Sequence, residues 1–179
     1  MRFGIAMGLA SLTLAGCTAD RMPVGEMTAP ADRGARAGIR TAAGLDVGQA
    51  TATQSGDSIR IRVEAAGMPP GTYGAHIHMT GRCDAPGFAS AGGHWNPTNR
   101  QHGKNNPAGM HVGDLPNLLV GTDGRGSLEI NLPGASITGG AASMLDADGA
   151  SIVIHQSPDD YRTDPAGNSG ARIACGVFG

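Results

Sequence analysis

The chain has 179 residues, enough for one ordinary domain, and its composition suits a small β protein with long loops. Glycine accounts for 30 residues and aromatic residues for only 3%, so the sequence has many turns and few large rings for a core. The formal net charge of −2 gives no sign of the basic surface of a nucleic-acid-binding protein, so nucleic acid is not expected as a partner.

The N-terminus has the features of a secretory leader. Met1 and Arg2 form a short positive region, and residues 3–14 form a mostly apolar stretch that ends in the sequence LAGC at residues 14–17. The stretch is too short to span a membrane. Its ending resembles a bacterial lipobox, which predicts cleavage before Cys17 and lipid on the Cys17 thiol. The alternative is a plain signal peptide followed by an incidental cysteine.

Cleavage before Cys17 divides the chain into three parts. We expect a signal peptide over residues 1–16, a lipidated cysteine with a flexible tether over residues 17–36, and a folded domain over residues 37–179. A first strand that begins a few residues before residue 37 is the alternative. Thr18 stands where aspartate retains some bacterial lipoproteins at the inner membrane. We therefore expect a protein of the cell envelope, on the periplasmic side and anchored by lipid to the outer membrane.

Short apolar or alternating runs separated by turn residues follow the tether. The clearest is Ser58–Glu64, in which Ile59, Ile61 and Val63 alternate with polar residues and residues 54–57 supply a hairpin turn. Further strands are expected near residues 45–53, 72–80, 115–121, 126–132, 150–155 and 172–177. With a first strand near residue 37, about eight short strands predict an all-β, antiparallel Greek-key barrel or sandwich.

Two long loops interrupt the strands, and the histidines gather in and around them. Five of the six histidines lie between residues 76 and 111, and the sixth is His155. Neutral imidazole is the commonest protein ligand for zinc and copper, so the clustering indicates a metal site. His76 and His78 are two residues apart in a β-like run, so both rings point to one face and supply half of a copper site. Three imidazoles and a carboxylate in the following loop suit a closed tetrahedral zinc site, namely His94, His102, His111 and Asp114.

The order of the motifs resembles that of one family. HIH at residues 76–78, then a cysteine, SAGGHWNP at 90–97, HG at 102–103, HVGDLPN at 111–117 and GNSGARIACGV at 167–177 are similar to the copper–zinc superoxide dismutases. The resemblance extends from about residue 37 to residue 179. It implies an enzyme, in its bacterial lipoprotein form, that dismutes superoxide to dioxygen and hydrogen peroxide. Copper would cycle between Cu(II) and Cu(I) beside a structural zinc ion.

The resemblance also implies the ligands of one copper and one zinc ion in each subunit. Copper would be bound by His76, His78, His94 and His155, and zinc by His94, His102, His111 and Asp114. His94 would then bridge the two metals and take part in catalysis.

Further residues of the site follow from the same resemblance. Asp159 would accept hydrogen bonds from one copper histidine and one zinc histidine; the alternative is a solvated turn acid, as Asp160 is expected to be. Arg172 would line the copper channel and attract the anion; the alternative is an exposed strand arginine. Cys83 and Cys175 would form a disulfide, which suits an exported domain.

The second long loop departs from the pattern of many family members. YRTDPAGNSG at residues 161–170 contains only Arg162 and Asp164 where a cluster of lysine and glutamate is common. Attraction of superoxide would fall to Arg82, Arg100 or Lys104, or would be weaker.

Two functions other than an enzyme remain open. The chain could be a metal-holding lipoprotein without turnover, or a surface interaction protein in which metals only stabilise the fold. Retention of every expected ligand and of Arg172 favours the enzyme. Members of the family pair through different faces or are monomers, so the sequence leaves a homodimer open.

Overall fold

A computed structural model describes residues 34–179, together with Met1 and Gly4. Most of the predicted signal peptide, Cys17 and most of the predicted tether lie outside the described residues. The described chain forms nine strands and one 3₁₀ turn. They are β1 (Gly34–Thr41), β2 (Asp46–Ser55), β3 (Ser58–Ala66), β4 (Gly71–Tyr73), β5 (Ala75–His78), η1 (Ala89–Ala91), β6 (Leu118–Val120), β7 (Arg125–Pro133), β8 (Ser151–His155) and β9 (Arg172–Val177). β1 begins three residues before the predicted start of the domain. In the described part of the chain, no helix is both long and apolar enough to cross a membrane.

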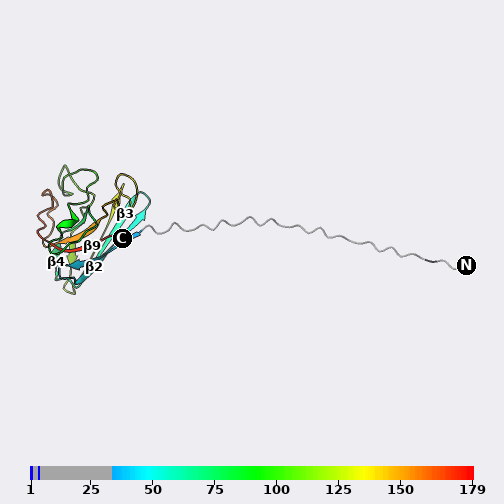
Figure 1. Ribbon diagram of the computed structural model, residues 1–179, viewed down its shortest axis with the longest axis horizontal. Helices are drawn as coiled ribbons and strands as arrows, with labels where there is room; N and C mark the ends of the chain where they lie inside the picture. Colours follow the sequence, from blue (N-terminus) through cyan, green and yellow to red (C-terminus); the bar gives the residue numbers. More distant parts are fainter. Residues whose placement is uncertain (2–3, 5–33) are drawn as a thin grey trace.

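The nine strands form one antiparallel sheet that curls into a nearly closed barrel (Figure 1). The strand order is β4-β6-β7-β3-β2-β1-β9-β8-β5. β4 and β5 stand at opposite ends of this order, yet only Gly74 separates them in the chain. The two ends of the sheet are therefore brought together. Pairing of β3 with β7 and of β1 with β9 requires the long crossovers of a Greek key, so the predicted fold class is confirmed.

The sheet has one strand more than predicted because the expected strand at residues 72–80 is split at Gly74. The N–H of Gly74 donates to the carbonyl of Ser157, and its carbonyl accepts from the N–H of His155, each at 2.8 Å. A Cβ at Gly74 would lie 2.7 Å from Oγ of Ser169, so a side chain does not fit there. The chain changes partners at this point, with β4 paired to β6 and β5 paired to β8.

Alternation along the strands fills the barrel with small and branched apolar side chains. Ile59, Ile61 and Val63 of β3 are fully buried, and the arginines between them are exposed, as the sequence predicts. Ile77 of β5 and Ile154 of β8 belong to the same core. The barrel interior therefore needs few aromatic rings, in keeping with the composition.

The opposite face of β5, β8 and β9 is also buried, although it points away from the barrel core. His76 of β5 pairs with Val153 of β8, which pairs with Cys175 of β9, and all three side chains are buried. Val153 and Cys175 pack with Phe88 and Ala91 in a second, smaller cluster. The long loops that follow β5 and β8 cover this face, and the predicted site lies beneath them.

Candidate metal centre

β5 presents two imidazoles to the loop-covered face because a core residue separates them. Ile77 points into the barrel, so His76 and His78 on either side of it point outward. His155 ends β8, where the register with β9 shifts after Ile154 and places His155 opposite Arg172. His94, from the first long loop, forms an isolated bridge with His78. Four histidines from three segments thus meet on one face of the sheet.

Four imidazoles form the first candidate metal group. One ring nitrogen from each of four buried residues lies within 4.8 Å of the others; the residues are His76, His78, His94 and His155. Nδ1 of His76, Nε2 of His78 and Nε2 of His155 are buried without a hydrogen-bond partner. Buried polar atoms rarely lack a partner, so three such nitrogens in one group fit a metal ion bound by imidazoles.

The other ring nitrogens determine which nitrogen of each histidine carries the proton. Nε2 of His76 lies 2.8 Å from Oδ2 of Asp159, and Nδ1 of His78 lies 2.9 Å from the carbonyl of Gly92. A main-chain carbonyl and an ionised carboxylate can accept hydrogen bonds but cannot donate them. The ring nitrogens that face these oxygens must therefore carry the protons. His155 has the same arrangement, with Nδ1 3.3 Å from the carbonyl of Gly170. In each ring the nitrogen without a partner keeps its lone pair for a metal.

Three imidazoles and one carboxylate form the second group. Oδ1 of Asp114 lies 2.9 Å from Nδ1 of His94, 3.0 Å from Nδ1 of His102 and 3.1 Å from Nδ1 of His111. The other oxygen, Oδ2, accepts from the N–H groups of Gly103 and His111. A convergent set of three nitrogens and one oxygen is typical of tetrahedral zinc. His94 belongs to both groups, since its Nδ1 faces Asp114 and leaves Nε2 for the first group.

Asp159 joins the two groups, as the resemblance implies. Its Oδ2 accepts from His76 of the first group and its Oδ1 accepts from Nε2 of His102 of the second at 2.9 Å. The N–H of Tyr161 also donates to Oδ1, at 2.7 Å. The side chain of Asp159 is fully buried, whereas Asp160 is exposed, so the two neighbouring acids differ as predicted.

Two residues that support Asp159 were not found from the sequence. Asn117 holds the main chain of Asp159 on both sides, with its Oδ1 accepting at 2.8 Å and its Nδ2 donating at 2.9 Å. Gly167 has a φ of +61°, and a Cβ there would collide with Oδ1 of Asp159 and lie 2.7 Å from Nε2 of His102. Both residues belong to quoted motifs, but only the folded arrangement of the two loops reveals their contacts.

Arg172 and the disulfide both fix the first long loop to β9. Nη1 of Arg172 donates to the carbonyl of Phe88 and Nη2 to the carbonyl of Gly92, each at 2.7 Å. Cys83 and Cys175 form the predicted disulfide. The carbonyl of Gly92 therefore accepts from Arg172 and from His78, so the arginine and a candidate copper ligand share one anchor.

Burial and neighbouring charges make three of the imidazoles neutral and two of the carboxyls ionised, while hydrogen bonds with Asp114 and Asp159 outweigh burial at His102 and raise its pKa to about 9. Burial, with neighbouring imidazoles, lowers the pKa of His78 to about 2, of His155 to about 3 and of His94 to about 4. Burial opposes ionisation of Asp114 and Asp159, but hydrogen bonds from imidazoles outweigh it and lower the pKa of both carboxyls. Neutral imidazoles and ionised carboxylates are the states in which these side chains bind metal ions.

The cations considered for steering lie outside the two groups. Arg82 pairs with Asp84 at 2.6 Å, and both side chains are exposed. Nζ of Lys104 lies 3.9 Å above the ring of Tyr161. Arg100 lines a groove beside His111.

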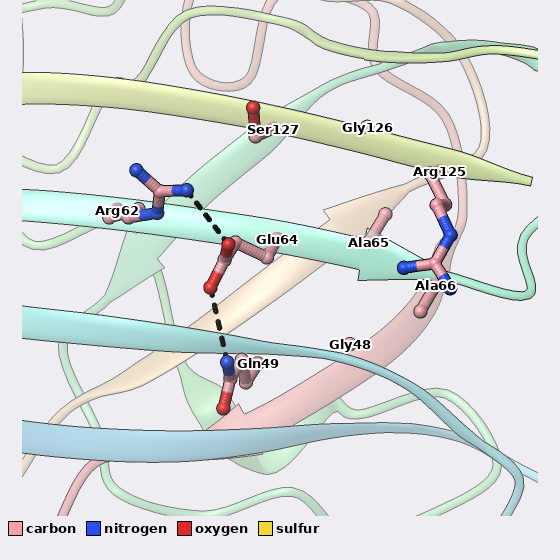
Figure 2. Close-up of a pocket in the computed structure, with 9 residues that line it drawn as sticks. All are labelled: Gly48, Gln49, Arg62, Glu64, Ala65, Ala66, Arg125, Gly126 and Ser127. Carbon is pink, nitrogen blue, oxygen red and sulfur yellow. Dashed lines mark hydrogen bonds and ion pairs between the residues drawn. The ribbon is translucent and has the colours of Figure 1, made fainter.

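A separate polar pocket lies on the outer face of β2, β3 and β7 and includes Gln49, Arg62, Glu64 and Arg125 (Figure 2). None of the predicted site residues lines it. The pocket therefore does not belong to the metal centre.

A Greek-key β-barrel with two histidine groups that share one ring defines the class of protein: a metalloprotein with a two-metal site beneath its loops. Comparison with known proteins gives the family. The family model of copper/zinc superoxide dismutase (SODC) matches residues 47–178. The chain therefore belongs to the copper/zinc superoxide dismutase family, oxidoreductases whose cofactors are copper and zinc.

Individual relatives cover most of the chain. The superoxide dismutase-like protein YojM of Bacillus subtilis is 40% identical and covers 99% of this chain and 95% of its own. The superoxide dismutase [Cu-Zn] of Caulobacter vibrioides is 42% identical, with coverage of 80% and 84%. Among solved structures, a SOD-like protein from Bacillus subtilis has a TM-score of 0.74 at 42% identity, covering 79% of this chain and 96% of its own. The clock protein EA4 has a TM-score of 0.69 at 30% identity, covering 83% and 94%.

Proposed function

We propose that this protein dismutes superoxide to dioxygen and hydrogen peroxide at a copper site supported by zinc. Copper would be bound by His76, His78, His94 and His155, and zinc by His94, His102, His111 and Asp114. The observation that carries the proposal is the pair of buried groups that share the ring of His94, one with three nitrogens lacking partners and the other centred on a carboxylate oxygen.

Copper would supply one-electron redox chemistry, which zinc does not have. The side chains of the protein determine the geometry and the movement of protons. The carbonyls of Gly92 and Gly170 and the carboxylate of Asp159 fix the rings of the first group. Burial lowers the pKa of His94 to about 4, so its ring is neutral near pH 7; its Nδ1 faces Asp114, and the lone pair of Nε2 is left toward the first group.

Arg172 would attract the anionic substrate. Its guanidinium is held by two main-chain carbonyls of the first long loop, so its positive charge has a fixed position, and one of these carbonyls, that of Gly92, also orients His78. Carbonyl oxygens do not neutralise this charge as a carboxylate would. The guanidinium remains available for a small anion.

The activity is tested by the consumption of superoxide by purified protein from which copper has been removed and then restored. We expect activity to disappear and to return with copper. Activity that persists without copper would contradict the proposal. Metal-loaded protein that consumes no superoxide would instead support a metal-holding protein without turnover.

Single-site variants test the assignment of ligands. His155→Ala should lose copper and retain zinc, because His155 belongs to the first group alone. His111→Ala should lose zinc and have a lower melting temperature, because a structural zinc contributes folding free energy. Its copper content should change little. Loss of zinc from His155→Ala, or of copper alone from His111→Ala, would refute the assignment.

We also propose that the mature protein is anchored by lipid at Cys17, on the periplasmic side of the outer membrane. The leader sequence supports this location, and the disulfide suits an oxidising compartment. Cys17→Ser should release soluble protein or block processing. A soluble wild-type protein without lipid would refute the anchor. A mature lipoprotein found with the inner membrane would refute the choice of membrane.

A further inference from the structure

Asp164 lies in the second long loop, and its carboxylate contacts residues of the second metal group. Its Oδ1 accepts the main-chain N–H of His102 at 2.6 Å and lies 4.0 Å from Nε2 of His111. The side chain of Asp164 is half exposed, whereas those of both histidines are buried. We propose that Asp164 is a positioning residue for the zinc site; this inference rests on the proposed assignment of His102 and His111 to zinc.

The first contact fixes a ligand residue directly. The ring of His102 is held at both nitrogens, with Nδ1 facing Asp114 and Nε2 facing Asp159. Asp164 adds a short hydrogen bond to the main chain of the same residue. Hydrogen bonds to a charged acceptor are roughly twice as strong as neutral ones. Three carboxylates therefore set the position of His102, and Asp164 is the one that fixes its backbone.

The second contact places a carboxylate beside the ring of His111. Nδ1 of this ring faces Asp114, and Nε2 is the nitrogen near Asp164. A distance of 4.0 Å is too long for a hydrogen bond, but the carboxylate of Asp164 lies next to the edge of the ring that does not face Asp114. The ring of His111 therefore has one carboxylate near each of its nitrogens. Such neighbours of ligands set both the tautomer and the orientation of the ring.

The turn that presents Asp164 is supported from within the second loop. The carboxylate of Asp160 accepts from the N–H groups of Arg162 and Thr163, from Oγ1 of Thr163 and from Nδ2 of Asn168. Asp164 follows directly after this capped turn. Its carboxylate therefore reaches the zinc loop from a braced segment, as positioning requires.

The test measures the zinc affinity of the whole purified chain by competition with a chromophoric chelator. Asp164→Ala should weaken zinc binding by about tenfold or more, the range seen when a partner of a metal ligand is removed. Asp164→Asn keeps an oxygen that can accept from His102 but loses the charge, so its zinc affinity should lie between those of Asp164→Ala and the wild type. Asp123→Ala is the matched control, since Asp123 is an exposed turn acid that accepts one main-chain hydrogen bond, from Arg125 at 3.0 Å.

Cobalt(II) placed in the zinc site gives a second readout, because its visible spectrum reports ligand geometry. We expect the spectrum to change in Asp164→Ala and not in Asp123→Ala. Wild-type zinc affinity and an unchanged cobalt spectrum in Asp164→Ala would overturn the inference, as would equal weakening in Asp123→Ala. If Asp164→Ala does not fold, Asp164→Asn decides, and wild-type affinity in that variant would overturn the inference. Wild-type protein that binds zinc but consumes no superoxide would overturn the proposed activity alone, because the zinc comparison does not depend on turnover.

Discussion

Gly167 lies against the carboxylate of Asp159 with its backbone in the left-handed region. We predict that Gly167→Ala will weaken zinc binding and lower the melting temperature, because its Cβ would displace Asp159 from His102. Left-handed backbone alone costs alanine roughly 1–2 kcal/mol. Gly44→Ala is the control, since Gly44 has a φ of +80° and open space around its Cα. Equal effects of the two substitutions on zinc binding and melting temperature would show that the clash is unimportant.

Arg172 is the residue at which electrostatic attraction can be measured. Superoxide is a small anion, so little binding energy is available beyond charge. We predict that Arg172→Ala will lower the rate by about tenfold or more and flatten its dependence on salt, because charge focusing raises on-rates by roughly 10–10³-fold. Arg172→Lys should be intermediate, because the charge remains while the planar fork that binds Phe88 and Gly92 is lost.

Metal content is the control for both Arg172 variants and should not change. Full activity of Arg172→Ala with both metals bound would remove Arg172 from the site. The same substitution at Arg82, which is exposed and paired with Asp84, should have a small effect.

At the scale of residues, the sequence predicted the histidines and the aspartate that the structure brings together in two groups, and it missed residues that hold them in place. Histidines are rare enough, and their spacing regular enough, for motifs to identify His76 or His111. Asn117 and Gly167 have common residue types, and their roles depend on contacts 42 residues apart along the chain or on a backbone angle. No local pattern in the sequence encodes either feature.

At the scale of elements, the alternation of apolar and polar residues predicted those strands of the barrel that have one face in the core and the other in solvent. Ser58–Glu64 falls within β3, and residues 172–177 are β9 with the predicted bounds. The division of β4 from β5 was missed because the carbonyl of Ser157, far along the chain, takes the N–H of Gly74. Pairing partners of this kind become apparent only once the sheet is assembled.

The disulfide connects the first long loop to β9 at Cys175. We predict that the double variant Cys83→Ala, Cys175→Ala will lose about 2–5 kcal/mol of unfolding free energy, the usual cost of removing a native disulfide from a small domain. Its activity should also fall at temperatures where it is fully folded, because the loop carries the carbonyls that hold Arg172. Denaturation and rate measurements check both effects. Reductant should destabilise the wild type and leave the double variant unchanged.

At the scale of the whole molecule, the buried histidines make the stability of the metal-free protein depend on pH. The pKa of His78, His94 and His155 lies below the ordinary value of 6.5, at about 2, 4 and 3. The unfolded chain therefore binds more protons at these sites, and stability is lost as pH falls from about 6.5 toward the folded values.

His102 has the opposite effect on stability. Burial would lower its pKa, but hydrogen bonds with Asp114 and Asp159 raise it to about 9, so its contribution is complete below pH 6.5 and is lost as pH rises through about 9. Three rings therefore lower the stability of the folded state as the pH falls below 6.5, and one ring lowers it as the pH rises above 6.5. We predict that the melting temperature of chelator-treated protein will fall more steeply from pH 6.5 to 4 than from 6.5 to 9. A melting temperature that does not change between pH 6.5 and 4 would contradict the lowered pKa values of the three rings. His102→Gln should remove the fall in melting temperature between pH 6.5 and 9.

The single carboxylate of Asp159 has a thermodynamic consequence for metal loading. Since it binds a ring from each group, filling either group orders a ligand of the other. Linkage requires the effect to be reciprocal, and such couplings are typically 5–150-fold. We expect zinc to raise copper affinity by about tenfold, copper to raise zinc affinity by the same factor, and Asp159→Asn to bring both factors toward one. Titrations of each ion with and without the other measure the four affinities. Partly loaded samples would therefore contain more doubly filled molecules than independent binding of the two ions would give.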